Sequence, residues 1–366
     1  MTQSRRVAVI HVGLEKTGTT AVQAWLAARR ADLWREGVLF PASPGAQNHT
    51  RLVAACLDDA VIDNIKAHQM AAQARSAPAL RARFLRDFGA ELGQGGWSRL
   101  VLSSELISSR LFAASEVDRL IAMVAPHVDA LRIVLVLRRQ ADLALSRFSS
   151  VLRAGFDRYA AVWDDLSAVA FRALPAGRVV DDMGDYFDFD RILSRFARLD
   201  AELRVSLYDP TDPLGPVLSA LDLPPVPDAL PRVNSALSAP AQALIARLNR
   251  DHAVQFPSGL RNEAYQTLLR QIEAQVSGPP RQVPRAEAEA FQARFTASND
   301  RLAARTGLRF SHDFSAFPPR VDDHRQPEPE ALRHWQAKAQ ALPRSEPTGQ
   351  LTLCRLRRLA ADLGLR

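Results

Sequence analysis

Short apolar runs alternate with longer helical patterns through the first half of the chain. The clearest runs are Val7–Val12, which is rich in β-branched residues, and Ile133–Leu137, which is apolar throughout. Both have the length and composition of buried β-strands. Three weaker strand patterns lie at Val38–Phe40, Leu100–Ser103 and Leu203–Tyr208.

Apolar residues at helical spacing fill the segments between these runs. Strands that alternate with helices favour a parallel sheet covered by helices on both faces, so we predict an α/β fold. The predicted helices are Thr20–Arg30, Ile62–Leu92, a helix that Ser115 and Asp118 open as a capping box and Pro126 closes, and Asp142–Ala154.

The chain changes character after residue 209. Seven prolines between residues 210 and 231 predict an irregular connection. Beyond it we expect helices at Ala239–Asp251, Asn262–Val276, Arg285–Thr306 and Leu353–Leu363. We interpret residues 1–230 as a core, 231–316 as a helical C-terminal part of the same domain, and 317–366 as a Pro- and Arg-rich tail with a short terminal helix.

Charge and composition narrow the possible partners. The 366 residues carry a net charge of +7, and 44 of the 47 basic residues are arginine because lysine occurs only at positions 16, 66 and 338. The basic residues are not interleaved with aromatic residues, so we expect no nucleic-acid partner. The basic surplus is compatible with an anionic ligand.

Targeting signals are weak. The longest aliphatic run, Ile133–Leu137, is far too short to cross a membrane, so we expect no transmembrane segment. Glu15 and Lys16 interrupt the apolar start, which argues against a signal peptide. The two cysteines, Cys56 and Cys354, are too few and too far apart in sequence for a disulfide framework. A reducing cytoplasm is therefore the expected compartment.

The most informative segment is His11–Thr20, between the first strand and the first helix. Gly13 and Gly18 allow tight turns and a close approach of the backbone to an anion. Thr17, Thr19 and Thr20 add hydroxyl donors, and Lys16 adds a cation. A junction of this kind directs backbone N–H groups and the positive end of a helix toward a phosphate.

The loop differs from that of nucleotide kinases. The nucleoside-triphosphate motif is Gly, four residues, Gly, Lys and Ser or Thr. Gly13, Gly18 and Thr20 fit this spacing, but Thr19 occupies the lysine position and Lys16 precedes the second glycine. The sequence therefore predicts a P-loop-type sheet with a phosphate loop that is not a kinase loop.

The run Lys-Thr-Gly-Thr-Thr at residues 16–20 resembles the 5′-phosphosulfate loop of sulfotransferases that use 3′-phosphoadenosine-5′-phosphosulfate (PAPS). The longer string His11–Gln23 is similar to a bacterial branch related in motif to carbohydrate sulfotransferases. That family binds the 3′-phosphate with an arginine at a strand end and a serine eight residues later. Arg138 and Ser146 have this spacing here, and Arg232–Ser235 resembles a further segment near the co-substrate.

The resemblance implies an enzyme that moves a sulfuryl group from PAPS to a hydroxyl or amine of an acceptor, with a carbohydrate or glycoconjugate as the expected acceptor. Lys16 would stabilise the leaving phosphate as a catalytic group. A sulfuryl group carries less charge than a phosphoryl group, so we expect no metal. The residues implied in PAPS binding are Gly13, Lys16, Thr17, Gly18, Thr19, Thr20, Arg138 and Ser146.

Two residues are candidates for the base that takes the acceptor proton. His49 follows the Val38–Phe40 run, and Glu105 follows Leu100–Ser103, so both lie at carboxyl ends of predicted strands. We expect one to be the base and the other to orient the acceptor, with Glu105 slightly favoured. His11, inside the first strand, is interpreted as a core histidine.

Two other functions stay open at this stage. A nucleotide kinase would need magnesium and a lysine directly after Gly18, where Thr19 stands instead. A non-catalytic module that binds PAPS or its product adenosine 3′,5′-bisphosphate (PAP) is compatible with every motif above. The sequence does not specify the acceptor or the oligomeric state.

Overall fold

The computed structural model describes residues 5–61, 63–73, 76–155, 186–226, 236–254, 262–321 and 327–343. The chain divides into two compact units. The first comprises Met1–Arg138, Ala176–Val233 and Ala297–Phe310. The second comprises Arg139–Pro175, Asn234–Thr296 and Ser311–Arg366.

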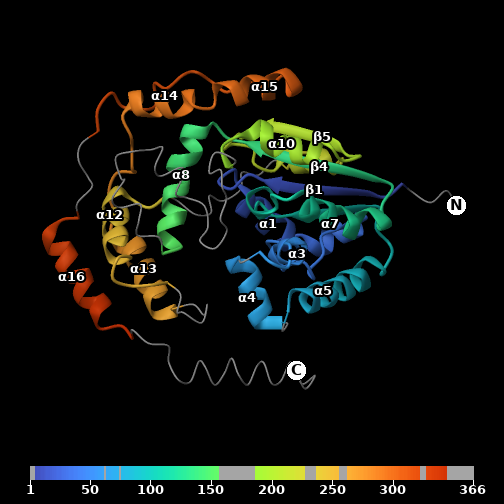
Figure 1. Cartoon of the computed structure of the whole chain (residues 1–366), viewed down its shortest axis with the longest axis horizontal. Coiled ribbons are helices and arrows are strands. Elements are labelled where there is room, and N and C mark those ends of the chain that lie inside the picture. Colours follow the sequence, from blue (N-terminus) through green and yellow to red (C-terminus); the bar gives the residue numbers. More distant parts are fainter. Residues whose placement is uncertain are drawn as a thin grey trace. The chain divides into compact units, whose positions relative to one another are not determined.

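A five-stranded parallel sheet forms the centre of the first unit, in the order β2-β3-β1-β4-β5. Figure 1 shows β1, β4 and β5 in this arrangement. All five predicted strands are confirmed. Their bounds are β1 Val7–Gly13, β2 Val38–Leu39, β3 Arg99–Ser103, β4 Ala130–Leu137 and β5 Glu202–Leu207.

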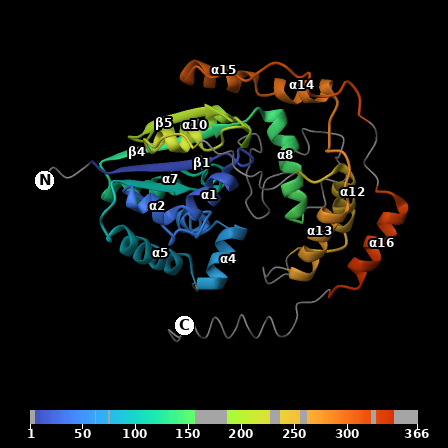
Figure 2. The same ribbon diagram turned by 180° about the vertical axis from the view of Figure 1, so that it is seen from behind.

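Helices cover the sheet of the first unit. Val9, Val101 and Val134 lie on one face and pack against apolar residues of α1, α2 and α11. Helix α10 contacts β4 and α7, while α1 and α2 lie side by side (Figure 2). The helices are α1 Thr19–Ala28, α2 Arg30–Arg35, α3 Thr50–Cys56, α4 Asn64–Gln73, α5 Ala77–Leu92, α6 Leu106–Arg110, α7 Ala114–Val124, η1 Ala125–His127, α10 Phe189–Ala197, α11 Gly215–Ala220 and most of α15 Thr296–Thr306. The chain therefore has the predicted α/β fold, with a parallel sheet flanked by helices.

The second unit is helical among its described residues. Its core joins Phe148 and Leu152 of α8 with apolar residues of the later helices, including Trp335, which is 4% exposed. The helices are α8 Gln140–Arg153, α12 Ala239–Leu248, α13 Glu263–Gln275, α14 Arg285–Ala293 and α16 Pro329–Gln340. Part of the predicted tail is thus a packed helix, whereas Leu353–Leu363 lies outside the described residues.

The division into units differs from the predicted domains. Helix α8 follows β4 directly in sequence but is grouped with α12 and α13, and residues 297–310 are grouped with the sheet. Apolar contacts between segments far apart in sequence decide this grouping, and composition along the chain does not record them.

Two predicted helices are interrupted. The segment 62–92 contains α4 and α5, because Ser76 caps α5 by accepting a hydrogen bond from the Ala79 N–H, with a proline in the first turn. The segment 285–306 contains α14 and α15. The predicted capping box at Ser115 is also wrong: α7 begins at Ala114, and Glu116 accepts from the Ala113 N–H (3.0 Å).

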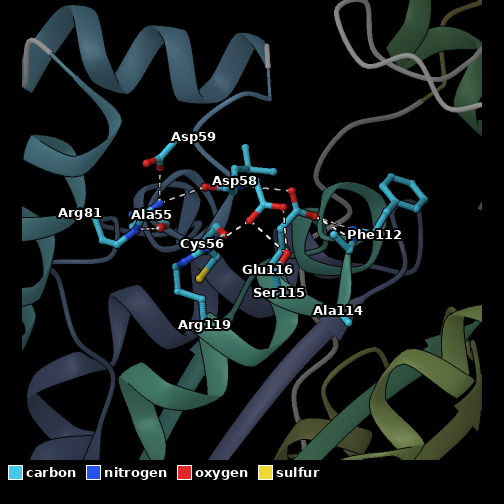
Figure 3. A network of polar contacts seen from close by, with 12 residues as sticks. Ala55, Cys56, Asp58, Asp59, Arg81, Phe112, Ala114, Ser115, Glu116 and Arg119 are labelled. Atoms are coloured by element: carbon cyan, nitrogen blue, oxygen red, sulfur yellow. Dashed lines mark hydrogen bonds and ion pairs between the residues drawn. The ribbon is translucent and has the colours of Figure 1, made fainter.

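A polar network joins the end of α3 to α5 and α7 (Figure 3). The Asp58 carboxylate accepts hydrogen bonds from Ser115 and Arg119. Arg119 and Arg81 donate to backbone carbonyls that follow the last turn of α3 or lie within it. The network fixes a helix end that would otherwise leave carbonyls without partners.

No helix among the described residues is both long and apolar enough to cross a membrane.

Candidate functional site

The loop between β1 and α1 has the backbone of an anion-binding turn. Gly13 and Gly18 adopt φ of 84° and 80°, and Lys16 adopts φ of 65°, a left-handed conformation that costs an ordinary residue about 1–2 kcal/mol. Such strain in a non-glycine residue is concentrated at functional sites. Gly18 is the N-cap of α1, and no described side chain caps this helix.

Two close approaches require the glycines. A Cβ at Gly13 would lie 2.7 Å from Cα and Cβ of Glu105, and one at Gly18 would lie 2.7 Å from Pro213. Gly13 therefore allows the turn after β3 to come into contact with the loop after β1. The buried Thr17 hydroxyl donates to the Leu14 carbonyl (2.6 Å) and closes the turn between them.

Arg138, at the end of β4, contacts the same loop. Its Nη1 donates to the Lys16 carbonyl (3.1 Å), so the side chain supports the strained residue directly. The guanidinium also lies over the Tyr208 ring, 5.4 Å from its centroid. The loop thus has a glycine-lined backbone, an ammonium group and a guanidinium, a combination suited to a phosphate or sulfate group.

Ser146 and Arg138 belong to different units. Ser146 is half-buried in α8 of the second unit, whereas Arg138 is placed with the loop in the first. The predicted pairing of these residues at a 3′-phosphate stays a prediction. The segment Arg232–Ser235 lies outside the described residues.

Glu105 follows β3 and is held by two side-chain amides. Gln23 of α1 donates to Oε2 (2.9 Å), and Asn48, which precedes α3, donates to Oε1 (2.8 Å). Asn48 accepts in turn from the Ser104 hydroxyl (2.7 Å). The carboxylate is therefore held from two segments, α1 and the segment before α3, and Cα and Cβ of the same residue lie against Gly13 at the start of the loop.

Burial raises the pKa of Glu105 above its ordinary value, and Glu15 of the loop adds to the shift by charge repulsion. Hydrogen bonds to the carboxylate act in the opposite direction because they favour the ionised form: first the bond from the backbone N–H of Glu105 itself, then those from Gln23 and Asn48. A carboxylate with a raised pKa that is still supported as an anion can accept a proton from a bound group.

His49 has a different environment from Glu105. The ring is fully buried and stacks on Phe40, with 4.6 Å between centroids, and its Nδ1 accepts from the Ser103 N–H (3.2 Å). Burial lowers the pKa of His49 to about 3, with a smaller contribution from Arg30 and an opposing one from the Pro41 backbone. A ring without exposed surface is poorly placed to take a proton from an acceptor.

His11 is a core residue, as its position in the first strand predicts. It is 1% exposed, and Nδ1 lies 3.0 Å from the Ser103 hydroxyl. Burial lowers the pKa of His11 to about 4. Both histidines therefore support the ends of β1 and β3 as neutral rings.

The sequence interpretation missed Gln23 and Asn48 as partners of Glu105, and Tyr208 beside Arg138. These contacts join residues 82 and 57 positions apart in the case of Glu105, so no local pattern indicates them. No group of three or more His, Cys, Asp or Glu side chains that could hold a metal occurs in the described part of the chain. The expected independence of metal stays a prediction.

Comparisons with known proteins give one structural likeness to report. No family model and no curated protein matches the chain. Among solved structures it is similar to a sulfotransferase domain from the curacin biosynthetic pathway, with 10% sequence identity and a TM-score of 0.34 over 81% of this chain and 99% of that chain. A likeness of this size leaves the function to be argued from the residues themselves.

Proposed function

We propose that the chain is a sulfotransferase that moves a sulfuryl group from PAPS to a hydroxyl or amine of an acceptor. The observation that carries the proposal is the contact between a phosphate loop and a candidate base: Glu105 lies against Gly13, and Arg138 binds the backbone of Lys16. Transfer needs both an anion site and a base next to it.

In this proposal each residue of the loop has a role in charge stabilisation. The N–H groups at the start of α1 and the hydroxyls of Thr19 and Thr20 bind the 5′-phosphate of PAPS. Lys16 neutralises the charge that grows on the oxygen between phosphorus and sulfur as that S–O bond breaks. The loop acts as a phosphate site whose positive charge comes from the protein.

Glu105 acts as the general base in this proposal. The acceptor oxygen or nitrogen forms the new bond to sulfur, its proton passes to Glu105, and PAP leaves with the electron pair of the broken S–O bond. The buried His49 ring supports the segment that carries Asn48 and does not contact the acceptor.

Arg138 and Ser146 are proposed to bind the 3′-phosphate, as the spacing of the motif implies. A carbohydrate or glycoconjugate is the proposed acceptor, on the strength of the motif resemblance at His11–Gln23. The proposal includes no metal, because Lys16 and Arg138 supply positive charge at the loop.

The test has a binding step and a transfer step. Titration calorimetry should give tighter binding of PAP than of AMP, ADP or ATP, and ³⁵S-labelled PAPS should label a polysaccharide or glycolipid acceptor in the presence of EDTA. Equal affinity for PAP and AMP would overturn the proposal. Tight PAP binding without transfer to any acceptor would favour a binding module, and magnesium-dependent transfer from ATP would favour a kinase.

A further inference from the structure

We propose that Asn48 is a positioning residue that, together with Gln23, aims the Glu105 carboxylate and keeps it ionised until the acceptor proton arrives. This inference rests on the proposed function, since it assigns the support of the proposed base. It adds two residues that no motif indicated and predicts how their loss changes the chemistry at Glu105.

The orientation of Asn48 is fixed before it reaches Glu105. The Ser104 hydroxyl donates to Asn48 Oδ1 (2.7 Å), so the amide nitrogen must be the atom that faces Glu105 Oε1 (2.8 Å). Ser104 is fully buried and its N–H donates to the His11 carbonyl, which ties it to β1. Asn48 therefore donates a hydrogen bond to Glu105 and accepts one from Ser104.

Gln23 completes the support from the opposite side. It is 2% exposed in α1, and its Nε2 donates to Oε2 (2.9 Å). Each carboxylate oxygen thus receives one amide hydrogen, which leaves lone-pair sites on both oxygens for a further donor. Two amide hydrogen bonds, one from α1 and one from the segment before α3, fix the plane of the carboxylate, and with it the direction of these remaining sites.

The same two amides contribute to the protonation state of Glu105, besides burial and the backbone N–H of Glu105 itself. An amide N–H can donate to a carboxylate but cannot accept from a carboxylic acid, so both contacts favour the ionised form. The charged group that faces Glu105 with opposite effect is Glu15, while Lys16 lies in the same loop and the nearby rings of His11 and His49 are neutral. Loss of one amide should therefore raise the pKa of Glu105.

The first measurement is a titration without substrate. ¹³C-NMR of protein labelled at the glutamate carboxyl carbon, with Glu105→Gln to assign the signal, gives the pKa of Glu105 directly. We expect Asn48→Ala and Gln23→Ala to raise it by about one unit each, and Asn48→Asp by more, because a second carboxylate then lies beside the first. Ser104→Ala, which releases the Asn48 amide, should give a smaller shift in the same direction.

The second measurement is the pH profile of sulfate transfer. In Asn48→Ala the acid limb should move to higher pH by the same interval, turnover should fall about 10–100-fold near pH 6 and recover in part above pH 8, and KM for PAPS should change little. Gln69→Ala is the matched control: this half-buried amide contacts Thr50 in α3 and not Glu105. It should leave the titration and the profile unchanged.

The outcomes separate the two proposals. An unchanged pKa of Glu105 in both Asn48→Ala and Asn48→Asp, in protein whose circular dichroism matches the unmodified chain, would overturn the role of Asn48 even if transfer is intact. A shifted pKa in a chain that transfers no sulfate would support the role of the amides and remove the proposed function. Gln23→Ala repeats the titration at the other oxygen if Asn48→Ala does not fold.

Discussion

Two glutamates of the first unit, Glu116 fully buried and Glu105 half-buried, illustrate the difference between a scaffold residue and a residue of the proposed site. Glu116 is fully buried and accepts from the backbone N–H groups of Phe112 (2.9 Å), Ala113 (3.0 Å) and Asp58 (3.3 Å). Glu105 accepts from two side-chain amides, and its Cα and Cβ lie against Gly13 in the loop between β1 and α1. The bonds of Glu116 hold the start of α7 against the segment after α3 (Figure 3). Those of Glu105 come from side-chain amides of α1 and of the segment before α3.

The lysines of this unit differ in the same way. Lys66 donates from Nζ to the carbonyls of Asp58 and Asp59, at 2.8 Å each, and is part of the same network as Glu116. Lys16 stands in a left-handed turn whose carbonyl is held by Arg138. Burial alone therefore does not indicate function. The features that indicate a functional site are a strained backbone, glycines at close approaches, and side-chain hydrogen-bond donors that hold a charged group in place.

The sharpest test of this contrast is Glu105→Gln. Removal of the base should lower turnover by about 10²–10⁴-fold with PAP affinity preserved, since proton transfer is lost and the phosphate loop is untouched. Stopped-flow or radiolabel assays of transfer, beside calorimetry of PAP binding, provide the measurement. If turnover falls less than tenfold, Glu105 is not the base.

Lys16→Ala should have the next largest effect. The contact of an ammonium with the leaving oxygen strengthens as charge develops, so turnover should fall by about 10²–10³-fold while PAP affinity falls much less. Lys66→Met is the control from the network: it should lower the free energy of unfolding and leave turnover of the folded protein unchanged. Equal losses of turnover in the two variants would contradict the assignment.

Glu116→Gln should give the reverse of the result for Glu105→Gln. The substitution weakens charge-assisted bonds to buried N–H groups, so the free energy of unfolding should fall by about 2 kcal/mol. Chemical denaturation followed by circular dichroism measures this loss, and turnover per folded molecule should equal that of the unmodified chain. If Glu116→Gln is as stable as the unmodified chain but has low turnover, Glu116 is not a purely structural residue and the contrast with Glu105 is wrong.

Arg138→Ala tests the cation at the edge of the loop. If Arg138 binds the 3′-phosphate, the preference for PAP over AMP should fall by about 10–100-fold, in line with a charge-assisted contact of about 1.5–3 kcal/mol. Arg132→Ala is a matched control on the same strand, because Arg132 pairs with Asp222 and Glu202 instead. A preserved preference in Arg138→Ala would reject the motif assignment.

The sheet and the loop were predictable because their signals are local. Apolar runs mark all five strands, and the spacing of Gly13, Lys16 and Gly18 marks the turn between β1 and α1. The strand order β2-β3-β1-β4-β5 was not predictable from periodicity, since strand pairing joins distant segments.

The support of the site was less predictable for the same reason. Gln23 and Asn48 approach Glu105 only after α1, the segment before α3 and the end of β3 have come together. An exposed histidine has a pKa suited to a base at neutral pH, and His49 follows a strand, yet stacking on Phe40 buries the ring and lowers its pKa. Burial decides the chemistry of such a residue, and it depends on packing that one segment does not encode.

The pH dependence of stability separates His49 from Glu105 once more. Burial lowers the pKa of His49 from 6.5 to about 3, so the unfolded chain binds the proton more tightly across this interval. The stability that the neutral ring contributes is complete above pH 6.5 and is lost as pH falls toward 3. Between pH 4 and 6 the slope of the unfolding free energy against pH should therefore decrease by up to about 1.4 kcal/mol per pH unit in His49→Gln.

Denaturant titrations at half-unit pH steps measure this slope. The acid limb of the pH profile of turnover, which we assign to Glu105, should stay at the same pH. If the pH profile of turnover has an acid limb near pH 6–7 and this limb disappears in His49→Gln, the histidine is the base instead.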